Sequence, residues 1–404
     1  MCPPSERRSR ELAREMDLLE RVDPSDPSVS SESLAVKKFT RVVDNPAPDT
    51  IRDKAALDAT LAHLYGLLGG RADYSAQTGE IPLVRRTNFL WDRLRGVRQD
   101  MSLQAMRDAW AVERLEQMAR FAVATEYLLC EERMGMGTGG DGGGGGGGGG
   151  TGGAHNSHLH VEQLGKTLVT LAHAYDDAAC EPEKVTDAPP PVPSSSSSST
   201  APASSSSSCS NSYPNEGEML CYRLLLRMDT HGPFRRPDGS AFLRDLRGAS
   251  RRALASPEVA FALDARREYY AGNCAGFFKL VASDRCSYLQ ACCLHRYFAR
   301  ARRRALEAAA ATFNATPLPM ATVAREVVFA DEDETERLVR ECGLTVVEAE
   351  DAGGEKTVAF KATPFVEPGE ERVARRERIV ERKAPATKSG FFRWRALIEG
   401  TAGR

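Results

Sequence analysis

The sequence predicts a mainly α-helical protein, in which a helical solenoid resembling TPR repeats is followed by a winged helix and interrupted by disordered insertions. First, apolar residues recur at helical spacing in successive segments separated by short Gly, Asn or Ser breaks, as in stacked antiparallel helix pairs. Second, the pattern changes to strand-like alternation only near the end, at residues 344–349 and 357–361. Third, two stretches are almost pure glycine or proline and serine, and such stretches bury too little apolar surface to fold.

Composition restricts the protein class. At 404 residues the chain is long enough for more than one domain, and 41% hydrophobic with only 7% aromatic residues favours helices over sheets. The formal net charge of −2 gives no global attraction to nucleic acid or membranes, so any such binding must be local. No window approaches the length of apolar sequence that a membrane span needs, and the charged N-terminus argues against a secretion signal. We expect no membrane association.

The N-terminal segment comprises residues 1–34. Its first part, residues 6–21, predicts a charged helix that carries Leu12, Met16 and Leu19 on one stripe. Proline and serine residues then end the helix.

Residues 35–134 are predicted to form the first part of the solenoid. A helix at residues 51–68 ends at a pair of glycines. The segment 88–132 predicts two helices that carry polar residues in ion pairs with neighbouring helices. We expect the break between them at residues 99–101, with Ser102 as the N-cap of the second helix.

Two disordered insertions are predicted, a glycine-rich one at residues 135–158 and a Pro/Ser-rich one at residues 181–212. Between them lies a single solenoid helix at residues 159–180. The second part of the solenoid spans residues 213–313, with Tyr222, Phe277, Phe278, Tyr288 and Leu289 in its core. Its predicted helices are residues 216–228, 242–254, 257–271, 275–280 and 288–313.

The winged helix is predicted at residues 314–364. A short helix at 319–329 is followed by a second at 331–342, which Gly343 ends. Two strands then alternate across a hairpin loop at 351–355. The remaining residues, 365–404, predict a charged tail with one helix at 370–383.

No catalytic or metal motif is found, so we expect neither an enzyme nor a cofactor. Gly165-Lys166-Thr167 is not a P-loop, because His160 occupies the position of the first glycine and the surrounding segment is one helix. The ten cysteines lack CxxC spacing, which favours reduced thiols in the cytosol or nucleus. A zinc site at Cys286, Cys292, Cys293 and His295 is the alternative, but adjacent side chains on a helix diverge by about 100° and do not converge on a metal.

Nucleic-acid binding is predicted without sequence specificity. The second helix of the winged helix is mostly acidic, so it would be repelled from the major groove of DNA. Basic residues elsewhere could bind phosphates of RNA or single-stranded nucleic acid, although the residues alone fit a solvated helix face equally well. The candidates are Arg296, Arg300, Arg303, Arg304, Lys356 and Lys361.

Four segments together resemble the Sac-three/GANP family. They are MCPPSERRSRE at 1–11, DRLRGVRQD at 92–100, YPNEGEMLCYRLL at 213–225, and YYAGNCAGFFKL at 269–280 with YLQAC at 288–292. The order of the segments is also that of the family. The signature residues are Cys2, Pro3, Glu6, Arg7, Asp92, Arg93, Arg95, Arg98, Gln99, Asp100, Asn215, Glu216, Gly272, Asn273, Phe277 and Phe278.

The resemblance implies a non-enzymatic scaffold of the nuclear complex that couples transcription to mRNA export. It further implies a PCI arrangement of solenoid and winged helix, a second PCI-domain protein and a small acidic Sem-type subunit as partners, and a joint platform that binds nucleic acid. We expect a nuclear protein, with the cytoplasm and the centrosome as alternative locations. The alternatives are a short family member at centrosomes or the spindle, and a subunit of another PCI assembly such as the proteasome lid, the signalosome or a translation-initiation factor. The MCP and DRLRGVRQD segments argue against a subunit of another PCI assembly, because the resemblance to the Sac-three/GANP family includes both segments.

Overall fold

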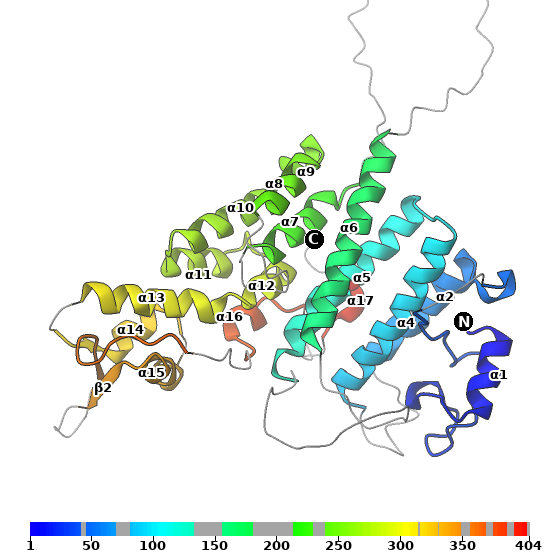
Figure 1. Ribbon diagram of the computed structural model, residues 1–404, viewed down its shortest axis with the longest axis horizontal. Coiled ribbons are helices and arrows are strands. Elements are labelled where there is room, and N and C mark those ends of the chain that lie inside the picture. The colour runs from blue at the N-terminus through cyan, green and yellow to red at the C-terminus, as the bar shows by residue number, and fades with distance from the viewer. Residues whose placement is uncertain are drawn as a thin grey trace, which may run out of the picture.

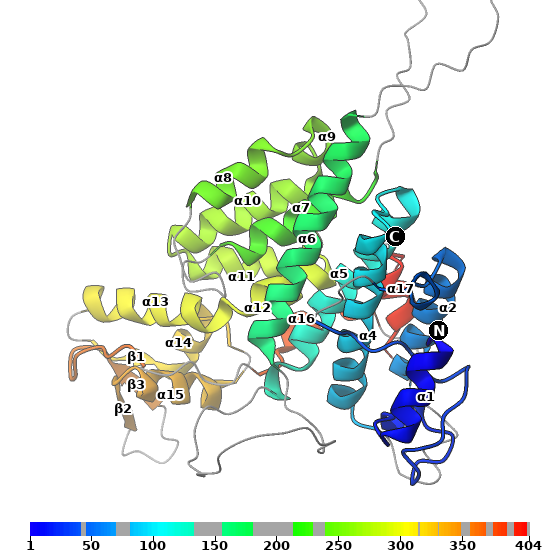
Figure 2. The ribbon, with the colours of Figure 1, turned by 45° about the vertical axis from the view of Figure 1, so that its right-hand side comes forward.

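The computed structural model is mainly helical, which confirms the predicted class (Figure 1). Its N-terminal segment and its small β-sheet lie at opposite ends of the molecule, and helices packed side by side fill the space between them (Figures 1 and 2). The predicted insertions, except for residues 156–158, lie outside the described residues. These are residues 1–41, 46–69, 81–132, 156–180, 213–228, 239–313, 316–329, 331–348, 356–368, 375–385 and 392–401.

The N-terminal segment forms only a short helix, so the predicted helix at 6–21 is wrong. Helix α1 (Pro4–Leu12) ends before Arg14, whose φ of 55° turns the chain. A single 3₁₀ turn, η1 (Leu18–Glu20), follows and is closed by an Asp17 capping box. Leu12 is exposed although Met16 and Leu19 are buried, because the chain turns between them.

Helices α2 (Lys54–Gly66), α4 (Leu83–Leu103) and α5 (Ala109–Leu128) form the first part of the solenoid. The break predicted at residues 99–101 is wrong, because Ser102 lies inside α4 and the N-cap of α5 is Asp108. The 3₁₀ turns η2 (Pro48–Thr50), η3 (Leu67–Gly69) and η4 (Cys130–Glu132) flank these helices.

The second part of the solenoid follows the predicted order with two additional breaks. The segment predicted as one helix at 242–254 divides at Ser250, which caps a short helix, and the segment at 288–313 divides at residues 296–297. The five predicted core residues are all buried. Helix α6 (Ser157–Cys180), the single helix predicted between the insertions, precedes this part. The helices of the second part are α7 (Glu216–Leu226), α8 (Gly239–Arg247), α9 (Arg251–Leu254), α10 (Pro257–Tyr270), α11 (Cys274–Ala282), α12 (Tyr288–His295) and α13 (Phe298–Thr312).

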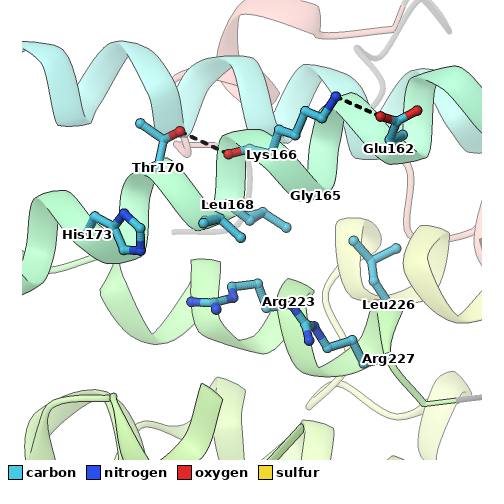
Figure 3. A pocket seen from close by; sticks show the side chains of 10 residues that line it. Glu162, Gly165, Lys166, Leu168, Thr170, His173, Arg223, Leu226 and Arg227 are labelled. Carbon is cyan, nitrogen blue, oxygen red and sulfur yellow. Dashed lines mark hydrogen bonds and ion pairs between the residues drawn. The ribbon is translucent and has the colours of Figure 1, made fainter. Parts of the chain in front are cut away.

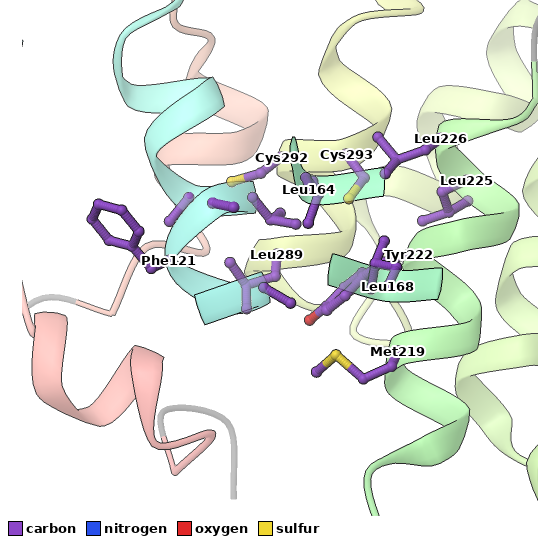
Figure 4. Close-up of a cluster of buried hydrophobic side chains, with 14 of the residues drawn as sticks. Phe121, Leu164, Leu168, Met219, Tyr222, Leu225, Leu226, Leu289, Cys292 and Cys293 are labelled. Atoms are coloured by element: carbon purple, nitrogen blue, oxygen red, sulfur yellow. The ribbon is translucent and has the colours of Figure 1, made fainter. Parts of the chain in front are cut away.

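The main core lies where α5, α6, α7 and α12 meet. Figure 4 shows Leu164 and Leu168 of α6 facing Tyr222 and Leu225 of α7, with Leu289 of α12 beside them. None of the helices in the described residues is both long and apolar enough to cross a membrane.

The C-terminal module, residues 316–368, has a separate small core around Val323, Val339 and Val358. Its strands pair antiparallel in the order β1-β3-β2, and Gly343, with a φ of +72°, ends the second helix. The two helices and two strands that were predicted occur in the predicted order, but the short strand β1 before them was not predicted. The assignment as a winged helix stays a prediction, and the loop at 351–355 lies outside the described residues. The elements are β1 (Leu318–Pro319), α14 (Met320–Glu326), α15 (Glu332–Glu341), β2 (Thr345–Glu348) and β3 (Lys356–Ala359).

The C-terminal tail does not extend away from the protein where it is described. Helices α16 (Arg378–Glu381) and α17 (Trp394–Ile398) are short, and their residues Val380, Leu397 and Ile398 are buried in the main core. Helix α17 lies beside α5 in both views (Figures 1 and 2). The tail therefore closes the solenoid, and its helix at 378–381 is much shorter than the predicted 370–383, of which residues 370–374 lie outside the description.

Candidate functional site

The DRLRGVRQD signature on α4 holds an extended segment, residues 35–40, which we call the strap. The Phe39 N–H donates to Asp92 Oδ2 at 3.4 Å, and Gln99 Nε2 donates to Thr40 O at 2.9 Å. The Arg95 guanidinium lies 3.8 Å from the centroid of the Phe39 ring, within cation–π distance. These side chains satisfy the strap's backbone, which has no regular secondary structure of its own.

A fully buried carboxylate, Glu20, connects α1, α4 and the strap. It accepts hydrogen bonds from Arg93 Nη2 at 2.9 Å, from Arg10 Nη1 at 3.1 Å and from the Val36 N–H at 2.9 Å. Burial alone would raise the pKa of Glu20, but the charges of Arg93 and Arg10 outweigh burial and lower it. Glu20 is therefore an ionised anchor for two buried arginines.

A second fully buried carboxylate, Asp100, connects α4 with the strap and with the segment before α2. Lys37 Nζ donates to its Oδ1 at 2.7 Å, and Arg52 Nε donates to its Oδ2 at 2.7 Å. Lys37 Nζ also donates to Thr50 O at 2.7 Å. Lys37 and Arg52 thus neutralise Asp100 within α4, at the position where the sequence predicted a break.

The other signature residues near this region are also in structural contacts. Pro3 is buried, Glu6 Oε1 accepts from the Lys38 N–H at 2.8 Å, and Arg7 pairs with Glu32 at 3.6 Å. Burial raises the pKa of the Cys2 thiol to about 11, which makes it a poor nucleophile at neutral pH. Burial lowers the pKa of Arg98, with Arg95 adding to the effect, to about 10.

The motif at residues 215–218, Asn-Glu-Gly-Glu, which we call NExE, takes part in a second buried network. This network connects α5, α7 and the C-terminal segment, and it reaches α6 through the Tyr175 hydroxyl, which donates to Glu116 Oε1 at 2.7 Å. Arg120 of α5 makes two hydrogen bonds to Glu218, at 2.8 and 2.7 Å, and a third to Ile398 O at 3.3 Å. This confirms that Arg120 pairs with a neighbouring helix. Asn215 Nδ2 donates to Glu116 Oε2 at 2.6 Å. Burial raises the pKa of Glu116.

The remaining signature residues position helices. They are Glu216 of the NExE motif and Gly272, Asn273, Phe277 and Phe278 of the segment at 269–280. Glu216 Oε2 accepts from the Ser250 hydroxyl at 2.7 Å. Gly272 has a φ of +70°, a conformation that favours glycine, and Asn273 caps α11 through the Gly276 N–H at 2.9 Å. The two phenylalanines behind this cap are fully buried.

A third network centres on Arg302 of α13, which sequence reasoning did not select. The side chain is 2% exposed, makes two hydrogen bonds to Glu377 of the C-terminal segment at 2.6 and 2.7 Å, and donates to Val327 O at 2.9 Å and Val328 O at 3.0 Å. Its guanidinium lies 4.5 Å from the centroid of the Phe278 ring. It thereby connects the solenoid, the C-terminal module and the tail. Its helical phase could have signalled burial, because Arg302 lies four residues from each of the buried Phe298 and Leu306 and so on their face of α13.

The four arginines predicted to bind nucleic acid are half-buried and have different surroundings. Arg304 lies 4.9 Å from the ring centroid of Tyr269, whereas Arg296 lines a small hollow beside Tyr127 and Cys293. Arg300, Arg303 and Arg304 are at positions i, i+3 and i+4 of α13, so they lie on one face of this helix. Arg300 is also half-buried.

The two candidate lysines lie on the C-terminal module. Lys356 is paired with Glu336 of α15 at 2.7 Å, whereas Lys361 is exposed. The role of the six candidates in binding nucleic acid stays a prediction.

The cysteine residues considered for zinc lie in the core. Burial raises the pKa of Cys286 to about 12 and that of Cys293 to about 12. His295 Nε2 is instead within 2.7 Å of Arg375 O. Within the described part of the chain, no group of three or more His, Cys, Asp or Glu residues could hold a metal ion.

Comparison with known proteins places this geometry in a family. The model of the SAC3/GANP family matches residues 1–348. The chain is 32% identical over 306 residues to "SAC3 family protein B" of Arabidopsis thaliana, covering 76% of this chain and 15% of the relative. It is 26% identical over 361 residues to "Protein xmas" of Drosophila melanogaster, covering 86% of this chain and 14% of the relative.

A third relative, "SAC3 family protein 1" of Schizosaccharomyces pombe, is 26% identical over 379 residues, covering 90% of this chain and 31% of the relative. The chain thus spans less than a third of each of these relatives. The match over residues 1–348 includes all four signature segments, whose side chains form the strap contacts, the buried networks and the α11 cap described above. The chain belongs to the SAC3/GANP family.

Proposed function

We propose that this chain is a non-enzymatic scaffold for mRNA export in the nucleus, which works by presenting surfaces to partner molecules. The observation that carries the proposal is the state of the signature residues. Asp92, Arg93 and Asp100 are used to hold the strap, and Asn215 holds the network around Glu116. Residues used to fix one arrangement of helices suit a rigid platform better than a catalytic centre.

We propose that the C-terminal module pairs with a second PCI-domain protein. Strand β2 lies at an edge of the three-stranded sheet, and Val347 on it is 45% exposed. An exposed strand edge can accept another chain, and an apolar side chain beside it adds contact area. A small acidic Sem-type subunit would complete the assembly.

Co-purification of the tagged chain followed by mass spectrometry tests this assembly. We expect a PCI-domain protein and a small acidic protein, and depletion of the chain should retain polyadenylated RNA in the nucleus. Val347→Asp should weaken the PCI partner's recovery, whereas Leu243→Asp, an equally exposed apolar position on α8, should not. Recovery of proteasome-lid, signalosome or initiation-factor subunits, with normal RNA export after depletion, would contradict the proposal.

We propose further that the assembly binds RNA or single-stranded nucleic acid through phosphates, without sequence preference. Three of the six candidates are chosen for the test: Lys361, which is exposed, and Arg300 and Arg303, which are half-buried and three residues apart on α13. Reversing these three to Glu should weaken binding similarly for different sequences and flatten the salt dependence by about 0.7 per lost contact.

Filter-binding titrations at several salt concentrations measure both effects. The matched control is the reversal of Arg251 and Arg252, two exposed arginines on α9. If affinity and salt slope are the same in the reversal variant, the control and the natural chain, the candidates are a solvated surface and the chain is a protein scaffold alone.

A further inference from the structure

Phe313 lies at the surface where α13 meets the C-terminal module. Leu306, Ala309 and Ala310 of α13 pack against the small core of this module. Phe313 is the C-cap of the helix and follows Ala309 and Ala310 by four and three residues, so it continues their face. It is 43% exposed. The residue is therefore held by the module and is still accessible to a ligand.

The ring of Phe313 is stacked on the ring of Phe360. The two ring centroids are 5.8 Å apart, and the ring planes differ by 27°. Phe360 directly follows β3, is 4% exposed and belongs to the core of the module. Stacking of this kind restricts the orientation of the exposed ring. A flat ligand that stacks on Phe313 therefore meets a ring that is already ordered, which lowers the entropic cost of binding.

A cation without an acidic partner lies next to the stacked rings. Lys361 follows Phe360 in the chain, is exposed, and has no ion pair with any residue that the structure describes. Strand β1 pairs with β3, which brings residues 318–319 beside residues 357–358. Neither of the surrounding segments, 308–325 and 356–366, contains Asp or Glu. An anion bound beside Phe313 would thus meet Lys361 and no carboxylate from these two segments.

The other exposed aromatic residue in the described part of the chain, Tyr270 of α10, has different surroundings. It is 48% exposed, but the Arg266 guanidinium lies 4.6 Å from the centroid of its ring. A cation at this distance already uses a π-face that a base would need. Tyr270 therefore serves as the matched control for Phe313.

The hollow of about 440 Å³ between α6 and α7 does not favour a ligand of one charge (Figure 3). Its Lys166 forms an ion pair with Glu162 at 2.7 Å, which Figure 3 shows. Its Arg223 and Arg227 both pair with the buried Asp245. An anionic strand bound there would have to compete with these carboxylates.

We propose that Phe313 stacks against a base of single-stranded nucleic acid while Lys361 binds a phosphate next to that base. This inference rests on the nucleic-acid binding proposed above and adds a base contact to it. The bases of a duplex are stacked on one another, so only a single strand offers a free base to the ring. Stacking tolerates every base, in agreement with binding that has no sequence preference.

A partner protein fits these residues less well than a nucleotide does. An apolar side chain of a partner would cover the Phe313 ring but leave Lys361 without a counter-charge. A nucleotide supplies a flat ring and an anion together.

A double comparison of ring and base tests the proposal. Fluorescence anisotropy measures the affinity of the full chain for a labelled oligothymidine and for an abasic strand of equal length and charge. Phe313→Leu keeps an apolar contact with Phe360 but removes the flat ring. We expect it to bind oligothymidine about fivefold more weakly than the natural chain, which corresponds to about 1 kcal/mol for one stacked base. Both proteins should bind the abasic strand equally.

Three further variants separate stacking from charge and from folding. Tyr270→Leu should bind both strands like the natural chain, and Phe313→Trp should retain the affinity for oligothymidine. Phe313→Leu should leave the salt dependence unchanged, whereas Lys361→Glu should flatten it by about 0.7. Circular dichroism confirms that each variant is folded.

The outcomes distinguish this inference from the proposed function. If reversal of Lys361, Arg300 and Arg303 weakens binding while Phe313→Leu behaves like Tyr270→Leu, the chain binds nucleic acid and the stacking assignment alone is wrong. If the natural chain binds neither strand, the proposed nucleic-acid binding fails, and this inference fails with it. If Phe313→Leu leaves strand binding unchanged and lowers recovery of the PCI partner, Phe313 is a protein contact. A loss of affinity confined to oligothymidine and to Phe313→Leu supports the proposal.

Discussion

Replacing Asp100 by asparagine should destabilise the protein far more than the same replacement at Asp108. Asp100 is fully buried and neutralises both Lys37 and Arg52, whose side chains are 10% and 4% exposed. The Asp100→Asn variant keeps the shape of the side chain but leaves two cations without their counter-charge. Removing one partner of a buried ion pair costs about 3–5 kcal/mol, a large share of a typical stability of about 5–15 kcal/mol.

Asp108 is the matched control on the next helix. It pairs with Lys54, but both side chains are about half exposed, at 51% and 48%. Exposed pairs contribute about 0–1 kcal/mol, and asparagine is as good an N-cap as aspartate, so the cap on the Ala111 N–H is preserved. The two variants therefore differ chiefly in burial of the ion pair.

Urea unfolding followed by circular dichroism measures both variants, and hydrogen exchange of the strap locates the effect. We expect a clearly lower midpoint and faster exchange at residues 35–40 for Asp100→Asn, and little change for Asp108→Asn. A triple variant with Lys37→Met, Arg52→Met and Asp100→Leu should recover part of the loss, because it leaves no unpaired charge. Equal midpoints for Asp100→Asn and Asp108→Asn would refute the reasoning.

Three further predictions concern other parts of the core. Phe278→Asp should cost several kcal/mol and give insoluble protein, unlike a charge reversal at exposed Arg376; a solubility assay decides this. Arg302→Lys should speed hydrogen exchange in the C-terminal module but not in α10, because lysine cannot hold Glu377 with two parallel hydrogen bonds and also donate to Val327 O and Val328 O as Arg302 does; unchanged exchange would argue against the link. Glu20→Gln should be less stable than the natural chain at pH 7. This difference in stability should shrink as the pH falls below about 4.3, because the pKa of Glu20 is lowered in the folded state and the natural chain loses the stabilising charge when Glu20 is protonated. Thermal melts of both proteins from pH 3 to 7 measure the difference.

Local pattern was enough to find most helices but not all of their ends. The spacing of apolar residues predicted α6 and α10 within a few residues. It failed at Ser102, near the ion pairs of Asp100 with Lys37 and Arg52, and at residues 13–17, near the ion pair of Glu20 with Arg93. A tertiary partner overrides local preference at such positions.

The candidate site was found from the sequence in part. The motif residues were identified, but their pattern alone could not say that Asp92 and Gln99 hold the strap or that Asp100 neutralises Lys37. The basic candidates were selected by their charge and, for the four arginines, by their expected position on one face of a helix. In the structure Arg304 lies beside the ring of Tyr269, and Lys356 pairs with Glu336. The sequence could not show this, because a pattern of charges does not say which neighbours a side chain packs against.

The sequence by itself determined the helical class, the order of the elements and the family, because periodicity and motifs are properties of short stretches of chain. Only the tertiary structure decided which charges are internal and where the tail lies. Arg120 and Ile398 are 278 residues apart, and Arg302 and Glu377 are 75 apart. No local pattern encodes such contacts. The contact of Arg120 with Ile398 exists because burial of Leu397 and Ile398 in the main core brings α17 back to α5.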